Sequence, residues 1–272
     1  AAAASGGTPA AGDLATGSRN VALAATALDA IQSGATDNTA VGYNALTAVT
    51  TGDKNVAVGS YAGASLTTSS QNVAIGYEAL NSSQTGNGYN TAIGCRALYG
   101  NTTGSENVAV GWGTATGMTT GTKNIAIGQG TLSSNTTASF NVALGYDSLC
   151  LVTTNGNNTS IGSYALKNTT GTSNTALGYN AGCGITTGGY NVYLGDGAGS
   201  GTTLASNNVA IGSGTLQAGG DSNGRNIAIG DTAGKCVTTG SKNTFIGSAS
   251  GFSTTTGSHN IGLGNCSMHG AT

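Results

Sequence analysis

Hydrophobic and polar positions alternate in a five-residue motif that recurs along almost the whole chain. Its sequence is asparagine, a β-branched residue, a small residue, an aliphatic residue and glycine. We number positions from the asparagine, so that the β-branched residue is at +1 and the glycine at +4. Position +1 is Val, Ile or Thr in all fifteen copies, and position +3 is Val, Ile or Leu. A period of two with β-branched residues predicts a strand. Glycine at +4, in fourteen copies, predicts a corner that needs positive φ or a close backbone contact.

The spacing of the motifs predicts stacked coils. Ten of the fourteen intervals are 17 residues, three are 18 and one is 16. Coils of nearly constant length are typical of solenoids, and stacking them would bring equivalent residues together at the inter-strand spacing of about 4.8 Å. The asparagines would then form a structural ladder of amides that donate and accept along the stack. Its members are Asn20, Asn38, Asn55, Asn72, Asn90, Asn107, Asn124, Asn141, Asn158, Asn174, Asn191, Asn208, Asn226, Asn243 and Asn260.

The two faces of each strand carry different side chains, and this difference predicts an oligomer. We expect the larger residues at +1 and +3 to point into the coil. Position +2 is Ala in eleven copies, although Ala is a poor strand former, so we expect a neighbouring chain to pack closely against it. Tyr193 and Phe245 also occupy +2 and are expected to loosen that contact.

Composition and charge narrow the chemistry. Only 7% of the 272 residues are charged and the formal net charge is −2, so no basic stripe predicts nucleic-acid binding. Seven of the eighteen charges directly precede a ladder asparagine, which predicts a corner that faces water. The two histidines, His259 and His269, lie in the last coil, and acidic residues do not recur in each coil, so we expect no catalytic site, no metal site and no cofactor. No run of about 18 apolar residues predicts membrane insertion.

Two further residue types raise hypotheses about surface chemistry. Five aromatic residues fall at +5, just after the corner glycine, and predict a surface aromatic row that either seals neighbouring coils or chains or binds a glycan or protein receptor: Tyr43, Tyr77, Trp112, Tyr146 and Tyr179. The five cysteines are an odd number, and Cys150 and Cys183 stand two coils apart, beyond disulfide reach. We expect buried thiols, with bridges between chains as the alternative.

The motif resembles the head repeats of YadA-like trimeric autotransporter adhesins and similar repeats of phage tail fibres. The copies that carry this resemblance most clearly are Asn72 to Gly76 and Asn124 to Gly128, both with the sequence Asn-Val/Ile-Ala-Ile-Gly. The resemblance covers residues 20 to about 270, with a repeat somewhat longer than the usual adhesin one. It implies a left-handed parallel β-roll assembled as a homotrimer.

Together these patterns predict an all-β chain: a parallel β-solenoid of about 15 coils in a single domain over residues 20–272, preceded by an extended or flexible lead-in over residues 1–19. The predicted function is a non-enzymatic structural fibre for surface attachment, extracellular, on a cell or a virion. Two alternatives stay open. One is a filament subunit that polymerises end to end, and the other is an ice-binding solenoid with outward threonine ranks.

Overall fold

The computed structural model describes residues 19–32, 34–82, 88–218 and 224–270. The chain divides into two compact units, residues 1–137 and 138–272, which are described separately. Of the predicted lead-in only Arg19 belongs to the described residues, so the rest of that prediction lies outside them. The single domain predicted for residues 20–272 stays a prediction.

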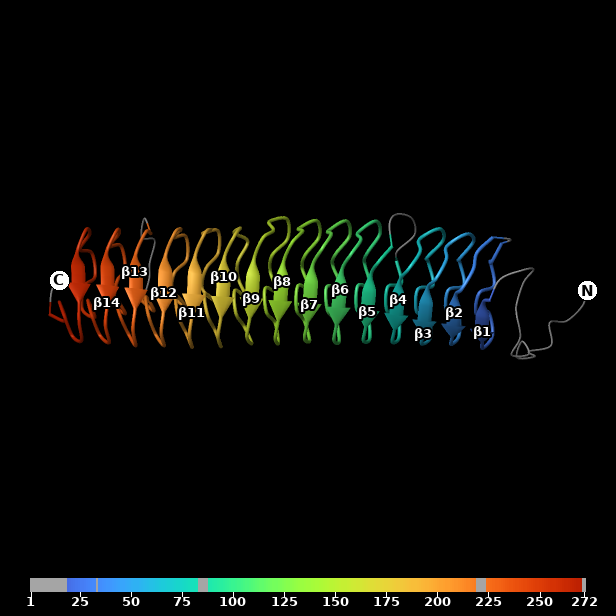
Figure 1. Ribbon diagram of the computed structural model, residues 1–272, viewed down its shortest axis with the longest axis horizontal. Helices are drawn as coiled ribbons and strands as arrows, with labels where there is room; N and C mark the ends of the chain where they lie inside the picture. Colours follow the sequence, from blue (N-terminus) through green and yellow to red (C-terminus); the bar gives the residue numbers. More distant parts are fainter. Residues whose placement is uncertain (1–18, 33, 83–87, 219–223, 271–272) are drawn as a thin grey trace, which may run out of the picture. The chain divides into compact units, whose positions relative to one another are not determined.

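In the N-terminal unit seven short strands pair side by side in chain order, each parallel to the next (Figure 1). Equivalent residues are partners, so that Val56 pairs with Val73 and Ala57 with Ala74. The strands are β1 (Val21–Leu23), β2 (Thr39–Val41), β3 (Val56–Val58), β4 (Val73–Ile75), β5 (Thr91–Ile93), β6 (Val108–Val110) and β7 (Ile125–Ile127).

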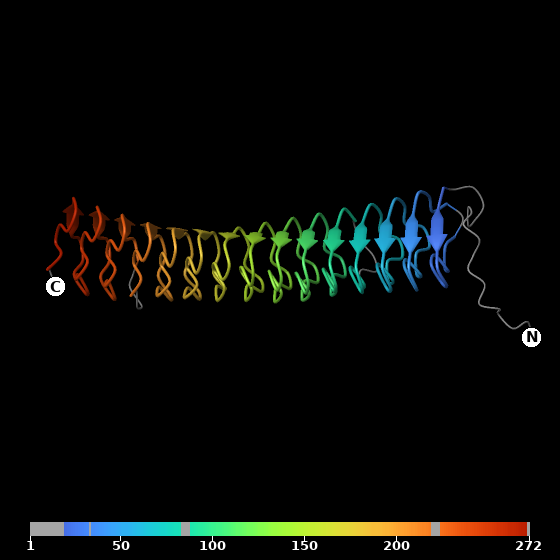
Figure 2. The same cartoon turned by 90° about the horizontal axis from the view of Figure 1, so that it is seen from below.

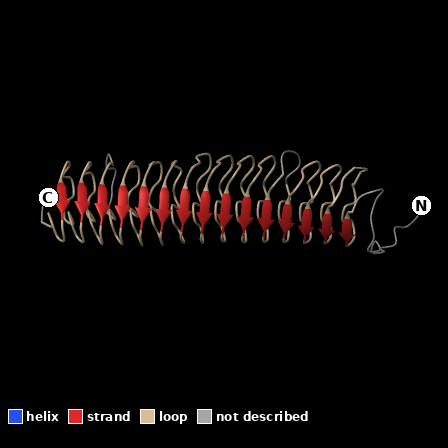
Figure 3. Ribbon diagram, in the orientation of Figure 1, coloured by secondary structure: helices blue, strands red, loops and turns tan. Residues whose placement is uncertain are grey.

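The C-terminal unit has the same architecture, with eight strands paired in order and in the same register. They are β8 (Val142–Leu144), β9 (Thr159–Ile161), β10 (Thr175–Leu177), β11 (Val192–Leu194), β12 (Val209–Ile211), β13 (Ile227–Ile229), β14 (Thr244–Ile246) and β15 (Ile261–Leu263). The regular structure of the described residues is strand alone, joined by turns (Figure 3). The prediction of an all-β parallel solenoid with a repeat of about 17 residues is confirmed.

The predicted orientation of the strands is wrong. The alanines at +2 point into the coil and are fully buried, as at Ala57, Ala74 and Ala92. The aliphatic side chains at +3 point outward, and Ile75 and Ile93 keep 36% of their surface exposed. The physical reason is the narrowness of the coil: the turn segment lies directly behind the strand (Figure 2) and fills the interior with its own leucines. A small side chain is therefore what fits at +2.

The return half of each coil supplies the other side of the core. Position +8 is leucine in eight copies, and residues such as Leu46, Leu80 and Leu166 are completely buried. These leucines adopt φ near +50°, a left-handed conformation that is unusual for a large side chain. Backbone hydrogen bonds to the next coil hold them there, for example from Leu46 N to Ala62 O at 3.0 Å.

The corner glycines meet both conditions that the sequence predicts. Gly42 has φ +134°, and a Cβ atom there would lie 2.6 Å from the carbonyl oxygen of Gly59 in the next coil. Each strand can therefore turn while its corner lies against the corner of its neighbour. Ala24 takes the same conformation with φ +128° in the first coil.

Tyr193 and Phe245 correct a second prediction, because they belong to the core and do not loosen a contact between chains. Both are fully buried, and the Tyr193 hydroxyl lies 2.9 Å from the Thr202 hydroxyl. Leucine at +8 is replaced by glycine in the coils beside each ring, and a Cβ on Gly182 would come within 2.6 Å of the Tyr193 ring. Space released by these glycines is what admits an aromatic ring at +2.

Burial of Tyr193 predicts a loss of stability in alkali. Desolvation raises its pKa to about 12, while the Thr202 and Asn208 side chains oppose this increase. The folded state therefore holds the phenol proton more tightly than the unfolded chain does. The free energy of unfolding should therefore fall as pH rises from about 10 toward 12. The total loss should be about 1.4 kcal/mol for each pH unit by which the pKa of Tyr193 in the folded state exceeds its pKa in the unfolded chain.

Chemical denaturation of wild type and Tyr193→Phe across this pH range tests the assignment. The difference in stability between the two proteins should change with pH, because only wild type carries the buried phenol. A difference that stays constant would contradict it.

Candidate functional site

The ladder asparagines lie stacked inside the coils, and all of them are buried except Asn260, which is half-buried. Asn55 is typical: its amide Nδ2 donates to Asn38 Oδ1 at 3.1 Å and to the Ser69 carbonyl at 2.9 Å. Its own Oδ1 accepts from the backbone N and the Nδ2 of Asn72, at 3.0 Å each. The same links recur between Asn90, Asn107 and Asn124 and, in the C-terminal unit, between Asn174 and Asn191. Since they tie coil to coil and are shielded from solvent, these amides serve the fold and offer no group to a ligand.

The residues directly before the asparagines point into solvent, as predicted for this corner. Lys54, Glu106, Lys123, Arg225 and Lys242 are exposed. Arg19 donates from Nε to Asp37 Oδ1 at 2.6 Å, and this contact lowers the pKa of the Asp37 carboxyl. Charges of both signs are spread along this corner, so it offers no concentrated patch of one sign.

The outward face of the strands carries many of the exposed apolar side chains of each unit. In the N-terminal unit its exposed members are Val21, Leu23, Val58, Ile75, Ile93, Ile125 and Ile127. In the C-terminal unit they are Leu177, Val192, Leu194, Ile227, Ile246, Ile261 and Leu263. We call this set, with the other +1 and +3 side chains, the outer sheet face. This face is aliphatic along +3 and mixed along +1, where five of the fifteen residues are threonine.

The predicted aromatic row lies on the surface, and the structure places its five members at 42% to 60% exposure. Tyr43 and Tyr77 do not touch each other directly. Tyr61 stands between them, with its ring edge-to-face against both, at centroid distances of 5.4 and 6.4 Å. Sequence reasoning missed Tyr61 because it occupies +6 and the row was defined at +5.

The C-terminal unit repeats this arrangement. Tyr164, also at +6, lies edge-to-face between Tyr146 and Tyr179, at 5.2 and 6.1 Å. The Lys167 ammonium lies 4.7 Å from the centroid of the Tyr164 ring and donates to Asp147 Oδ2 at 3.1 Å. The hydrogen bond raises the pKa of Lys167. We call Tyr146, Tyr164 and Tyr179 the tyrosine cluster.

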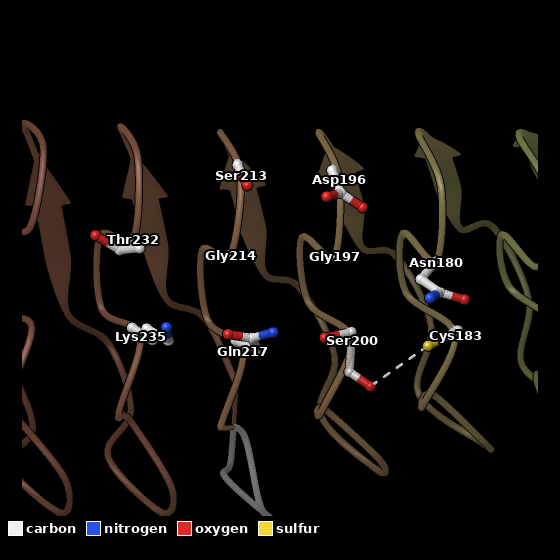
Figure 4. A pocket seen from close by; sticks show the side chains of 10 residues that line it. All are labelled: Asn180, Cys183, Asp196, Gly197, Ser200, Ser213, Gly214, Gln217, Thr232 and Lys235. Carbon is white, nitrogen blue, oxygen red and sulfur yellow. Dashed lines mark hydrogen bonds between the residues drawn. The ribbon is translucent and has the colours of Figure 1, made fainter.

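Beside the tyrosine cluster, still within the C-terminal unit, the surface is hollowed into a polar groove of about 410 Å³ (Figure 4). Its lining comes from four successive coils, at positions +5, +6 and +9 of the turn segments, and none of it comes from the outer sheet face. The lining residues are Asn180, Cys183, Asp196, Gly197, Ser200, Ser213, Gly214, Gln217, Thr232 and Lys235. Sequence reasoning missed the groove because glycine is abundant throughout the chain and does not single out these coils.

Side chains that could together ligate a metal ion are not gathered in the described parts of the chain, where no three His, Cys, Asp or Glu side chains lie close enough to hold one. None of the five cysteines is in a disulfide. Four of them are partly buried and Cys266 is exposed, and burial raises the pKa of Cys183. His269 stacks on Phe252 at 5.1 Å, and His259 is exposed. No helix among the described residues is long and apolar enough to cross a membrane.

No family model, curated protein or solved structure matches this chain. Two surfaces of the chain are the candidates for binding a partner: the outer sheet face, and the tyrosine-lined edge with its groove.

Proposed function

We propose that the chain is a non-enzymatic structural fibre protein for surface attachment, extracellular, of the adhesin-head or phage-tail-fibre-shaft kind, and that it assembles as a homotrimer. The observation that carries the proposal is the outer sheet face, which presents aliphatic side chains to solvent on strand after strand. Three copies packed around an axis would remove these side chains from water. Each Å² of apolar surface buried in this way would stabilise the assembly by roughly 25 cal/mol. The number three rests on the resemblance to trimeric adhesin repeats.

The covering surface differs from the one that the alanines at +2 led us to expect. Those alanines are interior, so a neighbouring chain must cover positions +1 and +3 instead. β-Branched and aliphatic residues interdigitate well at sheet interfaces, and this role accounts for their recurrence at positions that the coil itself leaves exposed.

Charge placed on the outer sheet face should dissociate the assembly. We expect wild type to sediment as three copies of the 26.1 kDa chain and the double variant Ile75→Lys/Ile127→Lys to sediment as single chains, since a buried, unpaired ammonium is strongly unfavourable. Because Ile75 and Ile127 face solvent in the isolated coil, circular dichroism should show that the variant still folds.

A matched control adds the same charge elsewhere. Gln71 and Gln129 are both exposed, and lysine already occupies the position of Gln71 in three other coils. Gln71→Lys/Gln129→Lys should keep the mass of wild type. A monomeric wild type, or a face variant that keeps the mass of wild type, would sink the trimer.

A filament subunit that polymerises end to end stays the alternative, in which the last coil of one chain would stack on the first coil of the next. Filaments whose length increases with protein concentration in electron micrographs would support this candidate, and particles of fixed size would exclude it.

A further inference from the structure

The polar groove of the C-terminal unit lies where two neighbouring coils have glycine at +6. That position is Asn180 in the first coil of the groove and Thr232 in the last, and Gly197 and Gly214 stand between them (Figure 4). A Cβ atom added to Gly197 would have its nearest neighbour, Gln217 Nε2, at 3.8 Å, and one added to Gly214 would have Gln217 Oε1 at 3.6 Å. These are ordinary van der Waals distances, so a side chain at either glycine would fit into the hollow without a clash.

Side chains around the hollow have hydrogen-bonding capacity to spare. Among the described residues, no side-chain hydrogen bond engages Asn180, Asp196 or Gln217. The Lys235 ammonium lies 5.9 Å from the centroid of the Phe252 ring, and no ion pair with it is seen in the described part of the chain. One carboxylate, two amides, one ammonium and nearby hydroxyls thus offer both donors and acceptors along the groove.

An aromatic platform adjoins this polar lining. Tyr179 occupies +5 of the coil before Asp196, and Gly197 N donates to the Tyr179 carbonyl at 2.9 Å, so the tyrosine and the groove belong to neighbouring coils. Tyr179 is 54% exposed, and its ring is held edge-to-face by Tyr164. Tyr179 therefore presents a solvent-exposed ring, held by the tyrosine cluster, from the same coil that contributes Asn180 and Cys183 to the groove.

A sugar ring is complementary to this combination. Its C–H face packs on an aromatic ring, while its hydroxyl rim needs closely spaced donors and acceptors of the kind that amides and carboxylates supply. An apolar ligand would leave the polar lining unpaired. A phosphate or sulfate group would meet Asp196 as well as Lys235, so the groove has no net positive charge to attract it.

We propose that the groove and Tyr179 together bind a short stretch of neutral oligosaccharide, built from hexose or N-acetylhexosamine units. The inference deepens the proposed attachment function, on which it rests, by naming the receptor class and its site. Groove residues occupy +5, +6 and +9, so a sugar bound there leaves positions +1 and +3 of the outer sheet face free to contact other copies.

The test fills the hollow without straining the backbone. Gly197 and Gly214 have φ +60° and +58°, and asparagine already occupies +6 at φ +55° in Asn44 and +53° in Asn180. Gly197→Asn/Gly214→Asn should therefore fold as wild type does. Gly113→Asn/Gly130→Asn makes the same change at +6 in two coils of the N-terminal unit, at φ +63° and +68°, and serves as the control.

Saturation-transfer NMR with maltotriose, cellotriose and N,N′,N″-triacetylchitotriose at millimolar concentration gives the readout. We expect wild type and the control to saturate at least one of these sugars, and the groove variant and Tyr179→Ala to bind that sugar at least about tenfold more weakly. Absence of transfer to all three sugars, or transfer that survives filling of the hollow, would overturn the inference. Sedimentation of the same samples separates the two proposals: trimers without sugar binding contradict the groove alone, and sugar binding by monomers contradicts the trimeric fibre alone.

Discussion

Exchange of Asn107 for aspartate should lower the free energy of unfolding by about 3 kcal/mol or more, because it places a buried negative charge without a cationic partner against two carbonyl oxygens. Asn107 Nδ2 donates to Asn90 Oδ1 at 3.2 Å and to the Gly121 carbonyl at 2.8 Å, and the side chain is 1% exposed. An aspartate would keep the two bonds that Asn107 Oδ1 accepts from Asn124 but would lose both donated bonds. Its negative charge would also face the two oxygen atoms that those bonds had satisfied.

The measurement is denaturant unfolding at fixed protein concentration, followed by circular dichroism. Asn207→Asp is the matched control, since Asn207 is exposed with φ +60° and Asp37 occupies the same position of its coil with φ +62°. The control should stay within about 0.5 kcal/mol of wild type. Equal losses in the two variants would show that the asparagines do not act as a buried ladder.

The deficit of Asn107→Asp should also depend on pH. Desolvation and the two facing oxygen atoms raise the pKa of the introduced carboxyl in the folded state above its value in the unfolded chain. The folded state then binds more protons, so the deficit is full at neutral pH and shrinks as pH falls through the folded-state pKa. A deficit that does not change between neutral and acidic pH would contradict this picture.

Removal of the Tyr193 ring should cost about 3–5 kcal/mol, the range for large aromatic residues replaced by alanine in a core. Tyr193→Ala leaves a cavity because Gly182, at +8 of the preceding coil, and Gly199, at +8 of the same coil, supply no side chain to fill it. Coils with Ala at +2 commonly have Leu at +8, as Ala74 and Leu80 do, with φ +51° at the leucine against +61° at Gly182. Addition of Gly182→Leu and Gly199→Leu to Tyr193→Ala should therefore restore most of the lost stability.

The two leucines should have the opposite effect when Tyr193 is retained, because their side chains would collide with its ring. The measurement is denaturant unfolding of four proteins: wild type, Tyr193→Ala, the glycine double variant and the triple variant. We expect an interaction free energy between position +2 and the two +8 positions that exceeds the scatter of about 0.5 kcal/mol found for independent sites. Additive effects would mean that positions +2 and +8 do not share one interior.

The coils could be predicted well because each rests on a local rule. β-Branched residues on both sides of Ala57 predicted β3, and the glycine at Gly59 predicted the corner that ends it. Asparagine at the same place in every coil predicted amides that meet in the stack. These features follow from backbone preferences and from the constancy of the repeat, both of which are visible without coordinates.

The inward face was predicted wrongly because a three-residue strand such as Val56–Val58 is apolar on both faces. Hydrophobicity favoured the larger side chains inside, but the width of the coil decides, and width depends on what the return half contributes. A signal was present nonetheless. Tyr193 at +2 coincides with glycine at +8 in its own coil and in the preceding coil, and Phe245 does the same with Gly251 and Gly234, as expected if both positions face one interior.

Surface features were harder to predict because they depend on neighbours several coils away. Tyr61 and Tyr164 join the aromatic row from +6, since successive coils bring +5 and +6 within ring contact. The groove combines two consecutive glycines at +6, Gly197 and Gly214, with side chains from four coils. Neither arrangement follows from any single copy of the repeat.

Pulsed dipolar spectroscopy most directly tests whether copies of the chain meet through the outer sheet face. The five native cysteines are first replaced by serine. A nitroxide is then attached to Thr175→Cys, at +1 of β10, or to Ser213→Cys, at the groove. Sedimentation checks that labelling leaves the mass of the assembly unchanged. We predict the modulation depth of three coupled spins, with shorter distances between labels at residue 175 than between labels at residue 213. Shorter distances at residue 213, or no coupling at residue 175, would contradict assembly through this face.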